Sequence, residues 1–155
     1  MSVLRESASN PTFDAAIFIA IFRMASLARS SRVKVLVYPP MYILYRAACF
    51  AYKVDISLRA KIGAGLKIYH PYCIAVGPGT VVGENCTLRH GVTLGNRFEG
   101  DDSYPVIGSG VSFGCFSVVV GRIHIRDNVT VPAHGMISTP NDALELRQVR
   151  GRGAA

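Results

Sequence analysis

Four histidines and four cysteines are the side chains of this 155-residue chain that are best suited to proton transfer, nucleophilic attack or metal binding. An imidazole exchanges its proton near neutral pH, so a well-placed histidine can serve as a general base. His70 stands out by its place, because it lies between residues 68 and 76, where a six-residue repeat is interrupted by two extra positions. A longer interruption holds the polar run 96–105. Solenoid proteins carry insertions on one face, often the binding face, so we expect the functional residues in these two segments.

The sequence around these segments repeats an aliphatic or aromatic residue every six positions. The repeated residues are Ile56, Ile62, Ile68, Val76, Val82, Leu88, Leu94, Ile107, Phe113, Val119, Ile125, Val131 and Ile137. A period of six fits neither a helix, with 3.6 residues per turn, nor a simple strand, with a period of two. It is typical of a parallel β-helix in which three hexapeptides form one triangular coil. The chain is therefore predicted to be mainly β, with the repeated residues stacked inside the coils.

Two apolar segments that precede the repeat predict helices. Residues 1–11 are polar and are expected to be loosely ordered. A first helix is predicted over 13–27, starting near Thr12 or Asp14, and Pro39-Pro40 is predicted to open a second one, because proline is tolerated in a first turn. The predicted division of the chain is a helical segment 1–53, a β-helix domain 54–139 and a C-terminal tail 140–155.

Both predicted helices are hydrophobic almost all round, which is unusual for exposed helices. Two interpretations stay open: the helices pack on each other, on the end of the β-helix and on a neighbouring subunit, or they lie at a membrane surface with basic residues facing anionic headgroups. A spanning helix is not expected, because the uninterrupted apolar run 15–22 is far shorter than the roughly 20 residues that a span needs. A signal peptide is not expected either, because no basic region precedes that run.

Composition limits the classes of ligand and partner that the chain is expected to bind. The formal net charge of +7 suits a polyanionic ligand or an acidic membrane surface, and no nucleic-acid-binding motif accompanies it, so nucleic acid is not an expected partner. The cysteines show neither a CxxC pair nor zinc spacing, and Cys86 occupies a small-residue position of the repeat, where it is predicted to be buried. Reduced cysteines predict a cytoplasmic protein.

The run VDISLRAKIGAGLKIYHPYCIAVGPGTVVGENCTLRHGVTLGNR, residues 54–97, resembles the serine acetyltransferase branch of the hexapeptide acyltransferases. Its RHGVTLGNR ending and the short helical lead-in are more similar to the colanic acid and exopolysaccharide O-acetyltransferases of that branch. The resemblance covers about residues 35–140. It implies a left-handed parallel β-helix, a homotrimer with active sites between subunits, and acetyl-CoA as the acyl donor.

The resemblance also implies a catalytic pair. In this family the histidine of the widened turn is the catalytic base, and an aspartate fifteen residues earlier pairs with it. His70 and Asp55 stand at these places. Fifteen residues is slightly less than one coil of eighteen, so the two are expected on the same side of the prism. Asp55 would then fix the tautomer of the imidazole and stabilise the imidazolium.

Further residues follow as expected contacts of acetyl-CoA. Backbone N–H groups near Gly95 and Asn96 are expected to stabilise the oxyanion. The resemblance gives Gly114, Cys115 and Ala133 as small residues that leave room for the pantetheine arm. Arg97 is a candidate contact of the CoA phosphates together with the arginines of the tail, and the alternative is that these side chains are simply solvated.

Two departures from the serine acetyltransferases bear on the acceptor. That branch carries an aspartate directly before the histidine and Arg-His-Pro in the long loop, where this chain has Tyr69 and Ser103-Tyr104-Pro105. The charged groups that would hold an amino acid are missing, which favours a sugar hydroxyl. Tyr69, His90 and Tyr104 are the candidate acceptor contacts, with aromatic packing as the alternative for Tyr104 and a structural role for His90.

The prediction is therefore an acetyl-CoA-dependent O-acetyltransferase that acts on a sugar hydroxyl of a polysaccharide or its precursor. A serine acetyltransferase of cysteine biosynthesis and a non-catalytic β-helix scaffold are the alternatives. No metal site is predicted, because zinc-binding hexapeptide proteins place two histidines about one hexapeptide apart with a third earlier. His90 has no such partner, and His124 and His134 fall at different coil positions.

Overall fold

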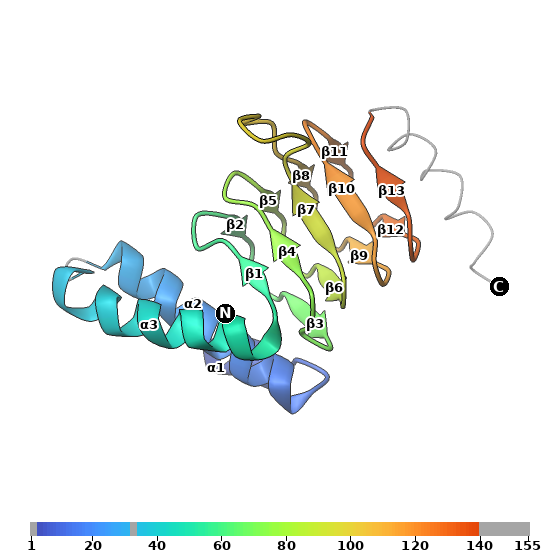
Figure 1. The fold of residues 1–155 in the computed structure, drawn as a ribbon. Coiled ribbons are helices and arrows are strands. Elements are labelled where there is room, and N and C mark those ends of the chain that lie inside the picture. Colours follow the sequence, from blue (N-terminus) through green and yellow to red (C-terminus); the bar gives the residue numbers. More distant parts are fainter. Residues whose placement is uncertain (1–2, 32–33, 140–155) are drawn as a thin grey trace.

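The computed structural model describes residues 3–31 and 34–139 (Figure 1). Three helices come first: α1 (Val3–Ala8), α2 (Phe13–Ser30) and α3 (Lys34–Tyr52). The strands, each two or three residues long, are β1 (Asp55–Ile56), β2 (Lys61–Ile62), β3 (Lys67–Tyr69), β4 (Ala75–Val76), β5 (Val81–Val82), β6 (Thr87–Arg89), β7 (Thr93–Gly95), β8 (Val106–Ile107), β9 (Ser112–Phe113), β10 (Val118–Val120), β11 (His124–Ile125), β12 (Thr130–Val131) and β13 (Met136–Ile137).

The strands form three parallel sheets that are the three sides of a prism. Sheet A has the order β1-β4-β7-β10-β13 and faces the viewer in Figure 1, sheet B has the order β11-β8-β5-β2, and sheet C has the order β12-β9-β6-β3. Each strand therefore pairs with the strand one coil away in the sequence, three strands earlier or later. This topology confirms the predicted parallel β-helix with a short helical part before it.

The core follows the six-residue period. The repeated residues from Ile56 to Ile137 are buried, except for Ile62, which is half-buried. The small residues four positions on, among them Thr80, Cys86 and Ser117, are fully buried as well. Burial raises the pKa of the Cys86 thiol, so this cysteine stays protonated at neutral pH. Its predicted role as a small buried residue is confirmed.

The two interruptions of the repeat border the same side of the prism. Asp55 pairs with Ala75, twenty positions on, so the two extra residues lie in the turn that leads from β3 of sheet C into β4 of sheet A. Ala75 pairs with Thr93, eighteen positions on, which is one uninterrupted coil. The long loop 96–105 leaves the other end of sheet A, between β7 and β8. An insertion therefore lies at each of the two prism corners that border sheet A: one precedes β4 and the other follows β7.

The helices cover the first coil of the β-helix, where the edge strands β1, β2 and β3 have no neighbouring coil (Figure 1). Their side chains bind the free backbone groups of all three sheets. Tyr45 donates its hydroxyl hydrogen to the carbonyl of Ile56 in sheet A. Arg23 donates to the carbonyl of Ile62 in sheet B at 2.8 Å. Asn10, in the turn between α1 and α2, accepts from Ile68 N–H in sheet C at 2.8 Å, so the open edge of each sheet has a side-chain partner from the N-terminal region.

Two expectations for the N-terminal region were wrong, and one was right. Residues 3–8 form α1 and are ordered by buried contacts of Glu6, whereas loose order was expected for 1–11. Helix α3 begins at Lys34, five residues before Pro39-Pro40, so both prolines lie inside it. The start of α2 was predicted correctly, since Thr12 is its N-cap and accepts from Ala15 N–H at 3.2 Å.

The glycines that follow the repeated residue allow neighbouring coils to stack closely. A Cβ added at Gly83 would lie 2.6 Å from the backbone carbon of Gly108 in the next coil, and no flexible side chain is available to move aside. We expect Gly83→Ala to lower the free energy of unfolding by about 1–3 kcal/mol, measured from urea denaturation. Gly95→Ala is the control, because its added Cβ meets nothing within 4 Å. An equal loss in both variants would show that coil spacing does not set the effect.

Candidate functional site

A hollow beside sheet A lies between this sheet and helix α3. This α3 pocket has a volume of about 710 Å³, which is within the range of about 300–1,000 Å³ that is usual for ligand sites. Its lining residues come from α2, α3, the first three strands of sheet A and the turns that follow them: Arg29, Tyr38, Tyr42, Tyr45, Arg46, Asp55, Ile56, Ser57, Leu58, Arg59, Ala75, Val76, Gly77, Pro78, Thr93, Leu94, Gly95 and Asn96. Three predicted site residues, Asp55, Gly95 and Asn96, are therefore brought together here.

The two walls of the α3 pocket differ in chemistry. The helical wall presents Tyr38 and Tyr42, one turn apart on α3, whose ring centroids are 5.6 Å apart. The sheet wall includes small residues, among them Ala75, Gly77 and Gly95, and a Cβ added at Gly95 would meet nothing within 4 Å. At the floor, burial raises the pKa of Tyr45, so its hydroxyl stays protonated and holds the Ile56 carbonyl. The pocket thus combines aromatic rings with a sheet wall that leaves space at Gly95.

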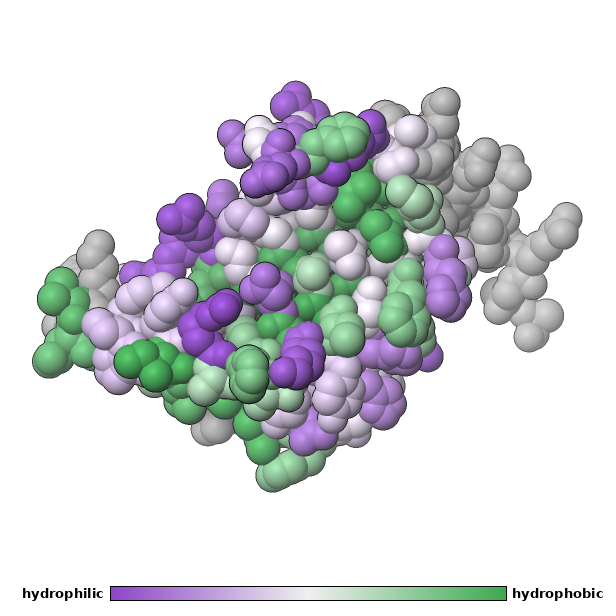
Figure 2. Space-filling view, in the orientation of Figure 1, coloured by the Kyte–Doolittle hydropathy of each residue, from purple (hydrophilic) through white to green (hydrophobic). Residues whose placement is uncertain are grey.

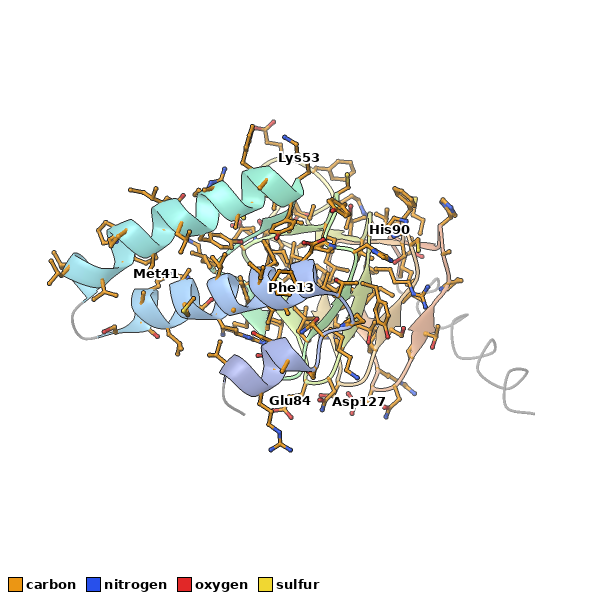
Figure 3. The ribbon with its side chains drawn as sticks, turned by 90° about the horizontal axis from the view of Figure 1, so that it is seen from below. Phe13, Met41, Lys53, Glu84, His90 and Asp127 are labelled. Atoms are coloured by element: carbon orange, nitrogen blue, oxygen red, sulfur yellow. The ribbon has the colours of Figure 1, made fainter. Side chains whose placement is uncertain are left out.

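A row of four ring side chains runs along the corner between sheets C and A. This corner ladder consists of His70, His90, Phe116 and His134. The centroids of consecutive rings are 6.3, 5.2 and 5.5 Å apart, with edge contacts at His90 and a stacked pair at Phe116 and His134. Figure 3 shows His90 on the side of the prism away from Glu84 and Asp127, which lie at the corner between sheets B and C.

Backbone conformation fixes the ladder in place. His70, Phe116 and His134 have φ values of 58°, 56° and 57°, in the left-handed region that side chains with a Cβ seldom adopt. For His70 the strained turn is the one that the two-residue insertion widens. Strain of this kind is retained where the surrounding structure imposes it, and it clusters at functional sites. The corner therefore presents His70 from a turn in the left-handed conformation.

The predicted pair of Asp55 and His70 is not joined in the single chain. The carboxylate of Asp55 is 82% exposed and lies 3.6 Å from the guanidinium of Arg46. Within residues 3–31 and 34–139, the hydrogen bonds and ion pairs include none between Asp55 and His70. An exposed ion pair of this kind stabilises by less than about 1 kcal/mol, so the contact with Arg46 is a weak competitor for the carboxylate. The catalytic roles of both residues stay predictions.

The remaining predicted contacts are spread around these two features. The ring of Tyr104 lies against the turn 77–79, since a Cβ added at Gly79 would meet it at 2.2 Å. This contact fits the packing alternative for Tyr104, and its role towards an acceptor stays a prediction. Arg97 lies beside Gly121 in the next coil. Tyr69 ends β3 next to His70 and has the Arg89 guanidinium 5.5 Å from its ring centroid.

Gly114 has a structural reason to be small. A Cβ added there would lie 2.3 Å from the backbone nitrogen of Ala133, so close contact between coils accounts for this glycine. Cys115 follows it in the same turn and Ala133 is exposed one coil further on. Their predicted contact with the pantetheine arm is therefore not needed to explain the glycine, and it stays a prediction.

Sequence reasoning missed the helical wall of the pocket and the third ring of the ladder. Tyr38, Tyr42 and Tyr45 recur at spacings of four and three in one helix, which places them on one face, and that pattern was the available signal. Phe116 carried no signal of its own, because it follows the repeat as an ordinary turn residue. Among the described residues no group of three His, Cys, Asp or Glu side chains could hold a metal ion.

Comparison with known proteins connects this geometry to a family. Over 109 residues the chain is 38% identical to the putative colanic acid biosynthesis acetyltransferase WcaB of Escherichia coli strain K12, a match that covers 68% of this chain and 67% of the relative. The chain belongs to the hexapeptide-repeat acyltransferases. The predicted family is thus confirmed, although no profile of a protein family matches the chain.

Solved structures of this acyltransferase family share the fold. The serine acetyltransferase of Neisseria gonorrhoeae (CysE) in complex with serine is 30% identical, with a TM-score of 0.68 over 81% of this chain and 50% of that one. A serine acetyltransferase in complex with CoA is 24% identical, with a TM-score of 0.70 over 84% of this chain and 52% of that one. The chain thus spans about half the length of these acetyltransferases. In the described part of this acyltransferase, none of the helices is long and apolar enough to cross a membrane.

Proposed function

We propose that the protein is an acetyl-CoA-dependent O-acetyltransferase whose acceptor is a sugar hydroxyl of a polysaccharide or its precursor. The observation that carries the proposal is the 38% identity to an acetyltransferase named for colanic acid biosynthesis. Two features of the chain support a sugar over an amino acid. Tyr69 and Ser103-Tyr104-Pro105 stand at the two places where serine acetyltransferases carry the charged residues that hold an amino acid, and they are uncharged; the α3 pocket in addition has an aromatic wall.

In the proposed reaction His70 is the general base. A sugar hydroxyl is almost wholly protonated at neutral pH, so its oxygen attacks the thioester carbonyl as the imidazole takes its proton. The tetrahedral intermediate then expels the CoA thiolate, and the imidazolium returns the proton to the sulfur. Asp55 orients the imidazole after leaving its weak contact with Arg46. Backbone N–H groups near Gly95 and Asn96, beside the open space on sheet A, stabilise the oxyanion.

Acetyl-CoA supplies the activated acetyl group. The residues of sheet A fit a thin substituent such as the pantetheine arm, because Ala75 and its strand partner Thr93 are small, as is Gly95 two positions further along β7, and all three line the pocket. Arg97, Gly114, Cys115 and Ala133 are the further proposed contacts of the donor. Tyr69, His90 and Tyr104 are the proposed acceptor contacts.

A serine acetyltransferase is the second candidate, favoured by the 30% identical structure that contains serine. The test is the release of CoA thiol from acetyl-CoA with L-serine and with galactose, galacturonic acid or galactose 1-phosphate as acceptor. Release with a sugar and not with L-serine supports the proposal. Release with L-serine alone overturns it in favour of the second candidate, and release with none of these acceptors, together with no CoA binding, favours a scaffold.

We also propose a homotrimer with active sites between subunits. Large apolar side chains that the single chain leaves exposed on the β-helix, Phe98 and Phe116, are available for contacts between subunits. The test is the mass in solution by analytical ultracentrifugation. A species of three times the 16.7 kDa chain mass is expected, and a monomer would contradict the proposal.

For the location we propose the cytoplasm, at the inner face of the cytoplasmic membrane. Leu36, Ile43 and Phe50 recur every seven residues on the exposed face of α3 and are 69–81% exposed. Figure 2 shows apolar residues gathered on this helix. Residues 34–52 include no acidic side chain, and the Lys53 ammonium lies 3.9 Å from the Phe50 ring centroid, so the face suits anionic headgroups.

We expect Ile43→Glu to weaken binding to phosphatidylglycerol-containing vesicles by roughly tenfold, because it places a charge on the apolar face. Co-sedimentation with the vesicles is the measurement. Met136→Glu is the control, since Met136 is 66% exposed at the opposite end of the β-helix and Ile43 is 69% exposed. Equal binding to neutral phosphatidylcholine vesicles, or no difference between the two variants, would contradict the membrane contact.

A further inference from the structure

The α3 pocket is strongly cationic, and Arg97, the described residue proposed to contact the CoA phosphates, does not line it. Three arginines line it, Arg29, Arg46 and Arg59, against a single carboxylate from Asp55 among its lining residues. Acetyl transfer to a neutral hydroxyl needs no positive charge on the acceptor side. An excess of cations in a concave site with low-dielectric walls attracts anions, because the walls concentrate the field.

The three arginines are not equivalent. Arg29 donates from Nη1 to the carbonyl of Leu58 at 2.6 Å, so its guanidinium is held against the turn 57–59 and keeps other N–H groups for a ligand. Arg46 shares its charge with Asp55 at 3.6 Å. Arg59 lies in the same turn, whose shape is fixed by the hydrogen bond from Arg59 N–H to the Ser57 hydroxyl at 3.2 Å. Arg29 and Arg59 thus form a cationic corner at the turn 57–59.

This corner and the tyrosine wall line the same pocket. Tyr38 and Tyr42 offer ring faces and hydroxyl groups at 5.6 Å centroid spacing, which suits the mixed apolar and polar surface of a sugar ring. The pocket volume of about 710 Å³ has room for a sugar with a substituent. An anionic group on that sugar would meet the guanidinium groups, which bind planar or tetrahedral oxyanions with paired N–H donors.

We propose that the acceptor is an anionic sugar, one that carries a phosphate or a carboxylate, and that Arg29 and Arg59 bind its charge in the α3 pocket. The ring lies against Tyr38 and Tyr42, and the acceptor hydroxyl points towards Asp55, the proposed partner of His70, which lines the same pocket. This inference rests on the proposed sugar O-acetyltransferase function and adds the charge of its substrate.

The test compares three probes that share a sugar ring: galactose, galacturonic acid and galactose 1-phosphate. Binding to the full chain is measured by calorimetry without acetyl-CoA, and acetyl transfer is measured by thiol release. We expect the charged probes to bind at least tenfold more tightly than galactose. The stronger of the two charged probes identifies the anionic group.

Arg59→Gln is the informative variant, because Arg59 is exposed and its side chain holds no part of the fold that the structure shows. It is expected to weaken binding of the charged probes, and to raise their KM, by roughly tenfold, while galactose is unaffected. Arg126→Gln is the matched control, since it removes an exposed arginine from the distant corner between sheets B and C.

The possible failures are distinct. Equal binding of all three probes, or an Arg59→Gln variant that binds the charged probes normally, overturns the anionic acceptor even if acetyl transfer occurs. A raised KM for acetyl-CoA with an unchanged KM for the acceptor also overturns it, because the arginines then hold CoA phosphates. Arg59-dependent binding of a charged sugar without acetyl transfer to any probe supports the anionic site and contradicts the proposed function.

Discussion

Replacing His70 with Asn is expected to lower kcat for acetyl transfer by about 10²–10⁴-fold, because the substitution removes the proposed general base. Asn is the better choice than Ala, since His70 has a φ of 58° and Asn tolerates the left-handed region with little strain. The measurement is thiol release from acetyl-CoA with the acceptor that the wild-type chain uses best. KM values should change much less than kcat, because the base acts in the chemical step.

His134→Asn is a closely matched control. His134 has a φ of 57°, stands on the same corner of the prism and stacks on Phe116 at the far end of the corner ladder. The two substitutions therefore make the same change in the same backbone conformation. We expect kcat of His134→Asn to stay close to that of the wild type. Similar losses in both variants would assign the effect to the ladder's packing, and retained activity in His70→Asn would rule out His70 as the base.

The fold could be predicted from the sequence because the same six-residue pattern recurs in every coil of the prism. Each apolar residue at the sixth position, such as Val76 or Leu94, is buried by its equivalents one coil away, so a local pattern determines a long-range contact. The interruptions of the period likewise located the two prism corners that border sheet A. The widened turn at His70 shows in the sequence as two residues more than the six-residue step between Ile68 and Val76.

The α3 pocket could not be read in this way. It exists because α3 packs beside sheet A and brings Arg46 to within 3.6 Å of Asp55. The six-residue period of the sequence does not determine where this helix packs. The order of α1 was missed for a related reason. Residues 1–11 are polar, and polarity predicts loose order unless buried partners are known to exist. The partner of Glu6 is Arg23, seventeen residues away on another helix.

Replacing Glu6 with Ala is expected to lower the free energy of unfolding by about 3 kcal/mol, because the change leaves one member of a buried ion pair without its partner. The Glu6 carboxylate is 5% exposed and accepts two hydrogen bonds from Arg23, at 2.9 and 2.8 Å. It also accepts from the N–H of Leu66 at 2.9 Å, beside the open edge of sheet C. Urea denaturation followed by circular dichroism is the measurement, and the midpoint should fall accordingly.

Two further variants separate the causes of this loss. Glu84→Ala removes an exposed carboxylate and should change the free energy of unfolding by no more than about 0.5 kcal/mol. Glu6→Gln keeps an acceptor for Arg23 and Leu66 but removes the charge, so its loss should fall between those of the two alanine variants. If Glu6→Ala is as mild as Glu84→Ala, the helices do not hold the end of the β-helix through this residue. If Glu6→Gln loses as much as Glu6→Ala, the charge of Glu6, rather than its hydrogen bonds, holds Arg23 against the carbonyl of Ile62.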